Sequence, residues 1–264
     1  DFTITSGDKV ISDLGGGTAT ISIPYTPKAG EDLNAIVIYH ITDEGELVLI
    51  TDCVYDAETG TLTFKLRHFS KYAVGYNKVE FTDTEGSWAK DYITYLSARN
   101  IISGDGTGRY LPGNNITRAE FTKILAGIAG IDTAQYKGSA FQDVDENSWY
   151  APYVAWAAEN GIVKGYGNGL FGPEDYITRE QIALMITRFA AVQNYTLPVA
   201  AEAIEFGDSD KISSYAREAV EKVQRAGIIN GRPSGDQIVF APLDNADRAE
   251  AAKMVAILMQ NMIK

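Results

Sequence analysis

A pattern that occurs three times after residue 79 limits most strongly how this chain can fold. In each copy an aromatic residue precedes an Asn or Gly by twelve positions, and later a Pro precedes an Arg by six. Such fixed spacings indicate a repeat architecture, in which one copy alone cannot bury its hydrophobic face. The chain must therefore fold as related units that share a core. The matching residues are Trp88, Asn100, Pro112 and Arg118; Trp149, Gly161, Pro173 and Arg179; Tyr215, Gly227, Pro242 and Arg248.

Each copy predicts two helices joined by a glycine-rich loop. The first helix contains the aromatic residue in an apolar stripe and ends at Asn100, Gly161 or Gly227, which tolerate left-handed backbone. The second follows a Thr or Asp cap, with Glu or Gln three residues later as in a capping box. Its first residue is Arg in every copy. The three starts are Thr117-Arg118-Ala119-Glu120, Thr178-Arg179-Glu180-Gln181 and Asp247-Arg248-Ala249-Glu250.

These arginines have the wrong sign for a helix start, where a cation costs a few tenths of a kcal/mol. One interpretation is a salt bridge to a carboxylate such as Asp83 or Asp143. The other is an anion site, in which Arg and free helix N–H groups bind a carboxylate or phosphate together. The aromatic residue earlier in each copy favours an anionic saccharide, because its face suits a sugar ring. The alternative for Trp88 and Trp149 is packing in the core.

The N-terminal part differs in pattern from the repeats. Residues 18–23, 35–40 and 61–66 alternate between apolar and polar side chains, and turn signals such as Gly15-Gly16-Gly17 separate the runs. Residues 1–78 therefore predict a small antiparallel β-sandwich. We expect its single cysteine, Cys53, to be a buried hydrophobe. With one cysteine and two histidines, His40 and His68, the sequence predicts no metal site.

Composition excludes several classes of function. The net charge is −12 and the pI about 4.6, so the overall field disfavours binding to nucleic acid or an anionic membrane. No apolar run approaches the ~18–20 residues of a membrane span. The glycine-rich loops lack the Lys-Ser or Lys-Thr pair of a phosphate loop, so no nucleotide or other cofactor is expected. The chain begins with Asp1-Phe2 rather than Met, and we expect a mature product or a fragment of a longer chain.

The repeats resemble the S-layer homology (SLH) family over about residues 80–264. The resemblance rests on the opening Phe81-Thr82-Asp83, on Trp88, on Ile101-Ile102-Ser103-Gly104 and on Ile116-Thr117-Arg118-Ala119-Glu120, with two further copies at matching spacing. The resemblance implies a pseudo-threefold helical assembly that anchors bacterial surface proteins without a covalent bond. It also implies grooves that bind secondary cell-wall polysaccharide through a terminal pyruvylated amino sugar, whose ketal is a carboxylate.

Carried over position by position, the resemblance implies a set of ligand-binding residues. They are the arginines Arg118, Arg179 and Arg248, the aromatics Trp88 and Trp149, the acidic residues Asp83, Asp143 and Asp208, and the loop glycines Gly104, Gly165 and Gly231. The third copy departs from the pattern through Tyr215, Asp247 and a longer loop that contains Pro233. We therefore expect the groove of Arg248 to be the weakest, because Asp247 adds a negative charge.

Together these observations predict an α+β multidomain chain, with a β-sandwich followed by an all-α pseudo-threefold assembly of three SLH repeats. The expected bounds are 1–78 for the sandwich and 79–135, 136–200 and 201–264 for the repeats. The predicted function is non-catalytic anchoring at the extracellular bacterial cell wall. Two alternatives stay open: a lattice protein that self-associates in an S-layer through the β-domain, or the anchor fragment of a larger surface hydrolase.

Overall fold

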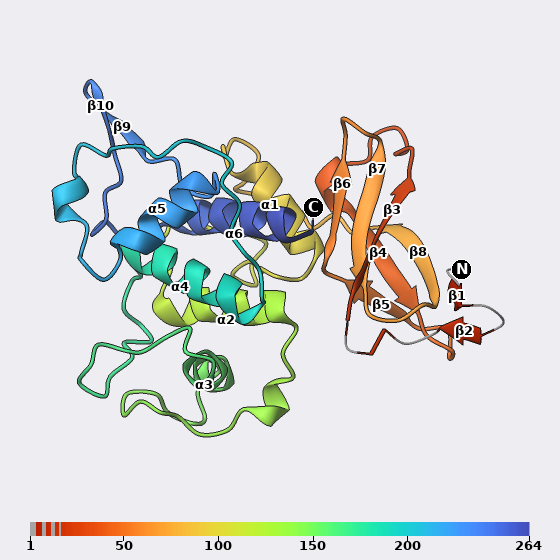
Figure 1. The fold of residues 1–264 in the computed structure, drawn as a ribbon, viewed down its shortest axis with the longest axis horizontal. Coiled ribbons are helices and arrows are strands. Elements are labelled where there is room, and N and C mark those ends of the chain that lie inside the picture. Colours follow the sequence, from red (N-terminus) through yellow and green to blue (C-terminus); the bar gives the residue numbers. More distant parts are fainter. Residues whose placement is uncertain (1–3, 7–8, 12–13, 16, 264) are drawn as a thin grey trace. The chain divides into compact units, whose positions relative to one another are not determined.

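The computed structural model describes residues 4–6, 9–11, 14–15 and 17–263 (Figure 1), so Asp1-Phe2 and Gly16 of the sequence analysis lie outside the described residues. The chain divides into two compact units, residues 1–110 with 259–264 and residues 111–258. The strands are β1 (Ile4–Ser6), β2 (Lys9–Ile11), β3 (Ala19–Pro24), β4 (Ile36–Ile41), β5 (Leu47–Ile50), β6 (Cys53–Asp56), β7 (Thr61–Leu66), β8 (Lys71–Tyr76), β9 (Arg232–Ser234) and β10 (Gln237–Val239). The α-helices are α1 (Lys90–Ala98), α2 (Arg118–Ala129), α3 (Ala151–Glu159), α4 (Arg179–Val192), α5 (Arg217–Arg225) and α6 (Arg248–Ile263). Three short 3-10 helices are η1 (Leu33–Ala35), η2 (Thr133–Gln135) and η3 (Ser209–Lys211).

In the first unit, two three-stranded antiparallel sheets have the strand orders β3-β7-β6 and β5-β4-β8. Strand β7 buries every second side chain, as its alternating sequence predicts. Ile36, Leu62 and Phe64 are fully buried in the shared core, and Cys53 joins them there, which confirms its prediction.

Helix α1 belongs to the same unit and is held to the strands by Arg99, which follows it directly. Arg99 is fully buried, and its guanidinium donates to the carbonyl oxygens of Cys53 at 2.9 Å and Ile36 at 3.0 Å. It also lies over the Tyr95 ring, 3.8 Å from the centroid. The first helix of the first repeat and the β-strands therefore form one compact unit, a coupling that the sequence analysis did not anticipate.

In the second unit, three segments that precede the second helices pair in a closed ring. Ile116 N donates to Ala246 O at 3.1 Å, Ala246 N donates to Ile177 O at 3.0 Å, and Ile177 N donates to Ile116 O at 3.0 Å. All three side chains are buried. The ring therefore fixes the starts of α2, α4 and α6 around one shared core.

The predicted fold class is wrong, because the repeats are not all-α and the structure is mixed. The third copy contains an antiparallel hairpin in which β9 pairs with β10, Arg232 lying opposite Val239. The three extra residues of this loop give it enough length to pair with itself, a consequence that the sequence analysis missed. Isolated β-bridges such as Thr117 with Tyr176 add further β structure, and the N-terminal part holds a separate β1–β2 pair besides its two sheets.

The local predictions at the helix ends are confirmed. The second helices begin at Arg118, Arg179 and Arg248. The first helices are followed by left-handed residues, with φ of 57° at Asn100, 69° at Gly161 and 72° at Gly227. Within the described part of the chain, no helix has the length and apolar character needed to cross a bilayer.

Candidate functional site

The backbone N–H groups at the start of each second helix are already bonded to the loop of another copy. In α2, Arg118 N donates to Asp175 O at 2.9 Å and Ala119 N donates to Pro173 O at 3.0 Å. Glu120 N donates to the Thr117 hydroxyl at 3.2 Å, which completes the predicted capping box. The first two N–H groups of α4 and of α6 donate to loop carbonyl oxygens of another copy in the same way. The hypothesis of free helix N–H groups is therefore wrong, and an anion at this place must be held by side chains.

The side chain of Arg118 reaches from the first copy into the second. Its Nε donates to Phe171 O at 2.8 Å and its Nη1 donates to Gln181 Oε1 at 3.0 Å. The guanidinium lies over the rings of Tyr166 and Phe171, 4.7 Å from each centroid, and the residue is only 6% exposed. Burial lowers the pKa of Arg118, but a guanidinium keeps its charge at neutral pH. Among the described residues no carboxylate lies within ion-pair distance of it.

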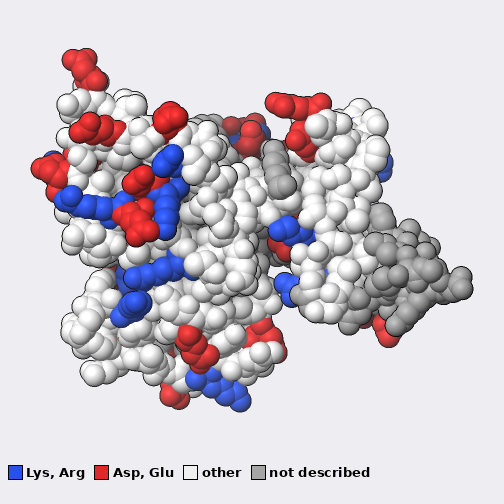
Figure 2. Space-filling model, in the orientation of Figure 1, with Lys and Arg blue, Asp and Glu red and all other residues white. Residues whose placement is uncertain are grey.

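A cavity of about 420 Å³ opens beside Arg118 and takes residues from all three copies. Lys164 and Arg188 add two cations, Tyr166 and Tyr215 add two aromatic rings, and none of the described residues that line it is a carboxylate. Figure 2 shows a basic group next to α4 that is surrounded by uncharged atoms. We call this cavity the Arg118 pocket. Its surroundings are suited to an anion.

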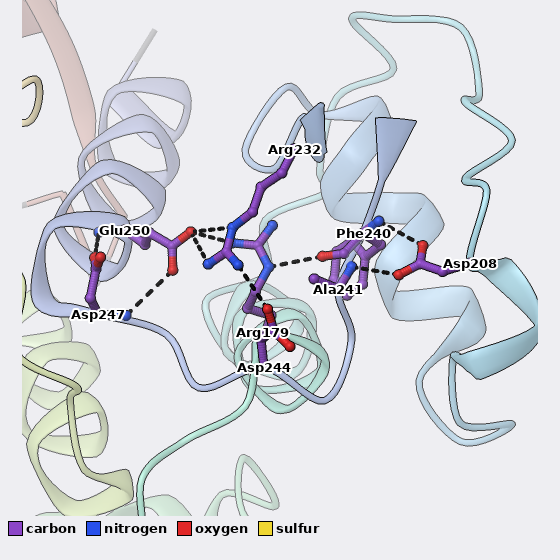
Figure 3. A network of polar contacts seen from close by, with 8 residues as sticks. All are labelled: Arg179, Asp208, Arg232, Phe240, Ala241, Asp244, Asp247 and Glu250. Atoms are coloured by element: carbon purple, nitrogen blue, oxygen red, sulfur yellow. Dashed lines mark hydrogen bonds and ion pairs between the residues drawn. The ribbon is translucent and has the colours of Figure 1, made fainter. Parts of the chain in front are cut away.

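The corresponding arginine of the second copy has a different environment (Figure 3). Arg179 Nε donates to Phe240 O at 2.9 Å, as Arg118 does to Phe171, but its Nη1 lies 2.7 Å from Glu250 Oε1. Arg232 of strand β9 also binds Glu250, at 2.6 Å, and binds Asp244 at 2.9 Å. We call these residues, with Asp247, the Arg179 cluster. Two cations and three carboxylates occupy it, so its own side chains neutralise Arg179.

The third arginine, Arg248, also has a carboxylate partner, but at a longer distance: its Nη1 lies 3.4 Å from Glu120 Oε1. The salt-bridge interpretation is thus correct for Arg179 and Arg248, although the partners are Glu250 and Glu120 and not Asp83 or Asp143. Each partner is the capping-box residue of another copy, a relation that the sequence analysis did not detect.

The acidic residues of the opening motif bind backbone N–H groups. Asp143 accepts from Phe171 N at 2.8 Å and from Gly172 N at 2.7 Å. Burial alone would raise the pKa of Asp143, but these two donors outweigh it and lower the pKa. Asp208 accepts from Phe240 N and Ala241 N at 2.8 Å each, and Asp83 accepts from Tyr110 N at 2.8 Å. In copies two and three these carboxylates fix the loop whose carbonyl receives the arginine Nε.

Steric constraints explain why the loops have glycine at these positions. A Cβ at Gly165 would collide with the carbonyl oxygen of Leu170 and the ring of Phe141, and its φ is +64°. Equivalent collisions would occur at Gly104, with Arg109 and Phe81, and at Gly231, with Ile238 and Phe206. The glycine lets the loop close on the Phe of the opening motif.

The aromatic residues that precede the first helices are exposed. The exposed fractions are 61% for Trp88, 51% for Trp149 and 55% for Tyr215, and all three lie before the helix rather than in its stripe, so packing in the core is wrong for them. The ring of Trp149 has the ammonium group of Lys123 above it, with Nζ 5.5 Å from the ring centroid.

Tyr215 lines the Arg118 pocket although it belongs to the third copy. Its hydroxyl donates to the buried Glu180 at 2.6 Å, and Glu180 also accepts from Ser213 N and Oγ. Burial and the Glu180 carboxylate together raise the pKa of Tyr215 to about 12. Glu180 was not among the predicted residues, although it stands where the other copies have Ala.

The expectation that Asp247 weakens the groove of Arg248 stays a prediction, but the structure also brings Asp247 close to the arginine of the second copy. Asp247 caps α6 by accepting from Glu250 N at 2.7 Å, and it lies in the Arg179 cluster (Figure 3). Burial, with the Glu250 charge, raises its pKa against the lowering effect of that bond and of Arg232. Asp247 and the longer loop, which carries Arg232, therefore act on the arginine of the second copy, whereas Tyr215 lines the pocket of the first.

The two histidines meet in the first unit, which the sequence analysis also missed. The rings of His40 and His68 lie 4.6 Å apart, and His40 Nε2 is 3.1 Å from the Ser70 hydroxyl. No group of three or more His, Cys, Asp or Glu that could hold a metal occurs among the described residues.

Comparison with known proteins gives a consistent result. A sequence model of the S-layer homology domain matches residues 80–122, 140–183 and 205–252. The chain is 37% identical over 205 residues to an amylopullulanase of Thermoanaerobacterium thermosulfurigenes, covering 78% of this chain and 11% of that protein. It is 36% identical over 182 residues to exoglucanase XynX of Acetivibrio thermocellus, covering 69% and 16% respectively. It is 30% identical over 172 residues to the S-layer protein sap of Bacillus anthracis, covering 64% and 20%. The chain thus spans a fifth or less of the length of these three relatives.

Proposed function

Because this chain belongs to the S-layer homology domain family, we propose that it anchors its parent protein by binding an anionic wall polysaccharide in the Arg118 pocket. Domains of this family bind cell-wall polymers and anchor extracellular surface proteins to the cell wall, and anchoring is the function of this chain. The ligand proposed for the pocket is the terminal pyruvylated amino sugar of a secondary cell-wall polysaccharide. The described residues then act as a binding module and not as a catalyst.

The observation that supports this proposal is the buried guanidinium of Arg118, which has no carboxylate partner among the described residues. A guanidinium has five N–H donors, and Arg118 uses two of them on Phe171 and Gln181. The remaining donors can bind a ligand carboxylate in the planar geometry that makes such pairs strong. Lys164 and Arg188 in the lining increase the attraction for an anion.

The sugar ring has aromatic partners in the same pocket. Tyr166 and Tyr215 both line it, and both are about half exposed. A ring that is apolar on its face and polar at its hydroxyl suits a sugar, which has the same two kinds of surface. We propose similar stacking roles for the exposed Trp88 and Trp149 in other grooves.

The other predicted residues then divide by role. We propose that Asp143 and Gly165 position the loop that faces Arg118, and that Asp208 with Gly231 and Asp83 with Gly104 do the same in their copies. Arg179 and Arg248 contribute less to binding than Arg118, because each has a glutamate beside it.

A pull-down with purified cell walls tests the proposal with the full chain, before and after chemical removal of pyruvate. The wild type should bind intact walls and lose most binding to depyruvylated walls, and Arg118→Gln should bind intact walls weakly. Arg109→Gln, at an exposed arginine that pairs with Asp105, is the matched control and should bind as the wild type does. Full binding to depyruvylated walls would exclude the ketal as the ligand. Wild-type binding by Arg118→Gln would exclude the pocket.

A further inference from the structure

The third residue of each second helix has two bonding partners. In α4, Gln181 Oε1 accepts from Thr178 N at 3.3 Å and from Arg118 Nη1 at 3.0 Å. In α6, Glu250 accepts from Asp247 N at 3.4 Å through Oε2 and from Arg179 Nη1 at 2.7 Å through Oε1. This side chain therefore joins the cap of its own helix to the arginine of another copy.

Capping does not require a charge at this position. The amide oxygen of Gln181 and the carboxylate of Glu120 both accept from the N–H of their cap residue, Glu120 from Thr117 N at 2.8 Å. Glu and Gln have nearly the same shape, and both complete a capping box. The choice between them therefore changes chiefly the charge next to the arginine.

That charge decides whether the arginine can accept an external anion. Arg179 is 3% exposed and has the Glu250 carboxylate as its direct partner, so a second carboxylate would meet repulsion at short range in a poorly solvated site. Arg118 has the neutral Gln181 amide in the same place. Each arginine donates Nε to the carbonyl oxygen of a Phe, at 2.8 Å for Arg118 and 2.9 Å for Arg179. This bond therefore cannot explain why the two sites differ in their capacity to bind an anion.

We propose that Gln181 is the specificity-determining residue that keeps the Arg118 pocket open to a carboxylate ligand. This inference rests on the proposed function of the pocket. A glutamate at position 181 would pair with Arg118 as Glu250 pairs with Arg179, and it would close the pocket to anions without changing the fold.

Two substitutions at this position separate charge from shape. Gln181→Glu keeps the shape and adds the charge, whereas Gln181→Ala removes the side chain and leaves Arg118 without a carboxylate. Gln135→Glu, in the exposed helix η2, adds the same charge away from the pocket and is the control. Titration calorimetry with a methyl glycoside of a pyruvylated amino sugar, alongside the wall pull-down, measures the binding of each full-length variant.

We expect Gln181→Glu to bind the glycoside at least tenfold more weakly than the wild type. Gln181→Ala should lose clearly less affinity than Gln181→Glu, because it removes a partner of Arg118 without adding a charge, and Gln135→Glu should stay within about threefold of the wild type. Thermal unfolding should show Gln181→Glu folded, since α2 and α6 have glutamate at this position, and it should show the other two variants folded as well. Equal affinity for the Glu and wild-type proteins would overturn the inference, and so would equal losses for Glu and Ala. Undiminished binding by Arg118→Gln, in contrast, would overturn the proposed function itself.

Discussion

Arg118 and Arg179 are placed alike by the backbone and yet have different environments. Both are the first residue of a helix, both donate a backbone N–H to a loop carbonyl, and both donate Nε to the carbonyl of a buried Phe. Arg118 then meets a neutral amide beside a 420 Å³ cavity, whereas Arg179 meets a carboxylate and a second guanidinium. Matching backbone positions in the repeat therefore do not make identical sites.

The difference has its origin in the third copy of the repeat. Glu250, Asp247 and Arg232 all belong to that copy, yet they surround the arginine of the second. Because each site forms between copies, a departure in one copy alters the arginine of another. The following predictions test this comparison from the largest expected effect to the smallest.

The first prediction concerns stability and uses the two residues that accept from the arginines. Glu250→Ala should lower the free energy of unfolding by about 3 kcal/mol or more, because it leaves buried Arg179 without a carboxylate. Gln181→Ala should lower it by less, about 1.5–2 kcal/mol, because the hydrogen bond that is lost has a charge only on its Arg118 side. Urea unfolding of both variants measures the difference. Equal losses would mean that the two sites are energetically alike.

The second prediction concerns binding. Arg118→Gln should weaken wall binding by about 2 kcal/mol, or roughly 30-fold, as expected for the loss of a charge-assisted pair with the ligand. Arg179→Gln should change affinity by less than about twofold, because its charge is already neutralised within the chain. A wall-binding isotherm for each variant decides the point. A larger loss for the Arg179 variant would reverse the assignment of the two sites.

The third prediction separates loop positioning from ligand contact. Asp143→Asn and Asp208→Asn should each cost about 1–3 kcal/mol of stability, because each leaves a backbone N–H of its loop without a good acceptor. Only Asp143→Asn should also weaken wall binding, since it loosens the loop around Arg118. Thermal unfolding and wall binding are compared for the pair. Loss of binding in both variants would show that the Arg179 cluster also binds the polymer.

The fourth prediction concerns alkaline pH and the Arg118 pocket. The pKa of Tyr215 is raised from 10.0 to about 12, so its folded-state pKa lies above the unfolded value. The stabilisation from its bond to Glu180 is therefore complete below pH 10 and is lost as the pH rises towards 12. Tyr215→Phe should be less stable than the wild type at neutral pH, and the two should converge between pH 10 and 12. Parallel stability curves over this interval would contradict the raised pKa.

The sequence predicted the parts of this structure that depend on neighbouring residues. The helix starts at Arg118, Arg179 and Arg248, the cap at Thr117 and the left-handed end at Asn100 follow from local bonding and backbone sterics. The resemblance to the S-layer homology family was also visible in the sequence, because it rests on the spacing of residues along the chain. The hairpin β9–β10 was missed, because three extra loop residues do not by themselves reveal that they pair.

What only the tertiary structure decided is which charges meet. Glu120, Gln181 and Glu250 were identified as capping residues, but their second partners are 63 to 128 positions away along the chain. The ring of bonds among Ile116, Ile177 and Ala246 brings the helix starts together, and with them each arginine to the cap of another copy. Local propensity cannot encode such a contact, because its energy depends on distance in space and on burial from water. The sequence by itself therefore determined where the arginines stand on their helices, and the packing of the copies determined that Arg118 faces an open pocket while Arg179 is neutralised.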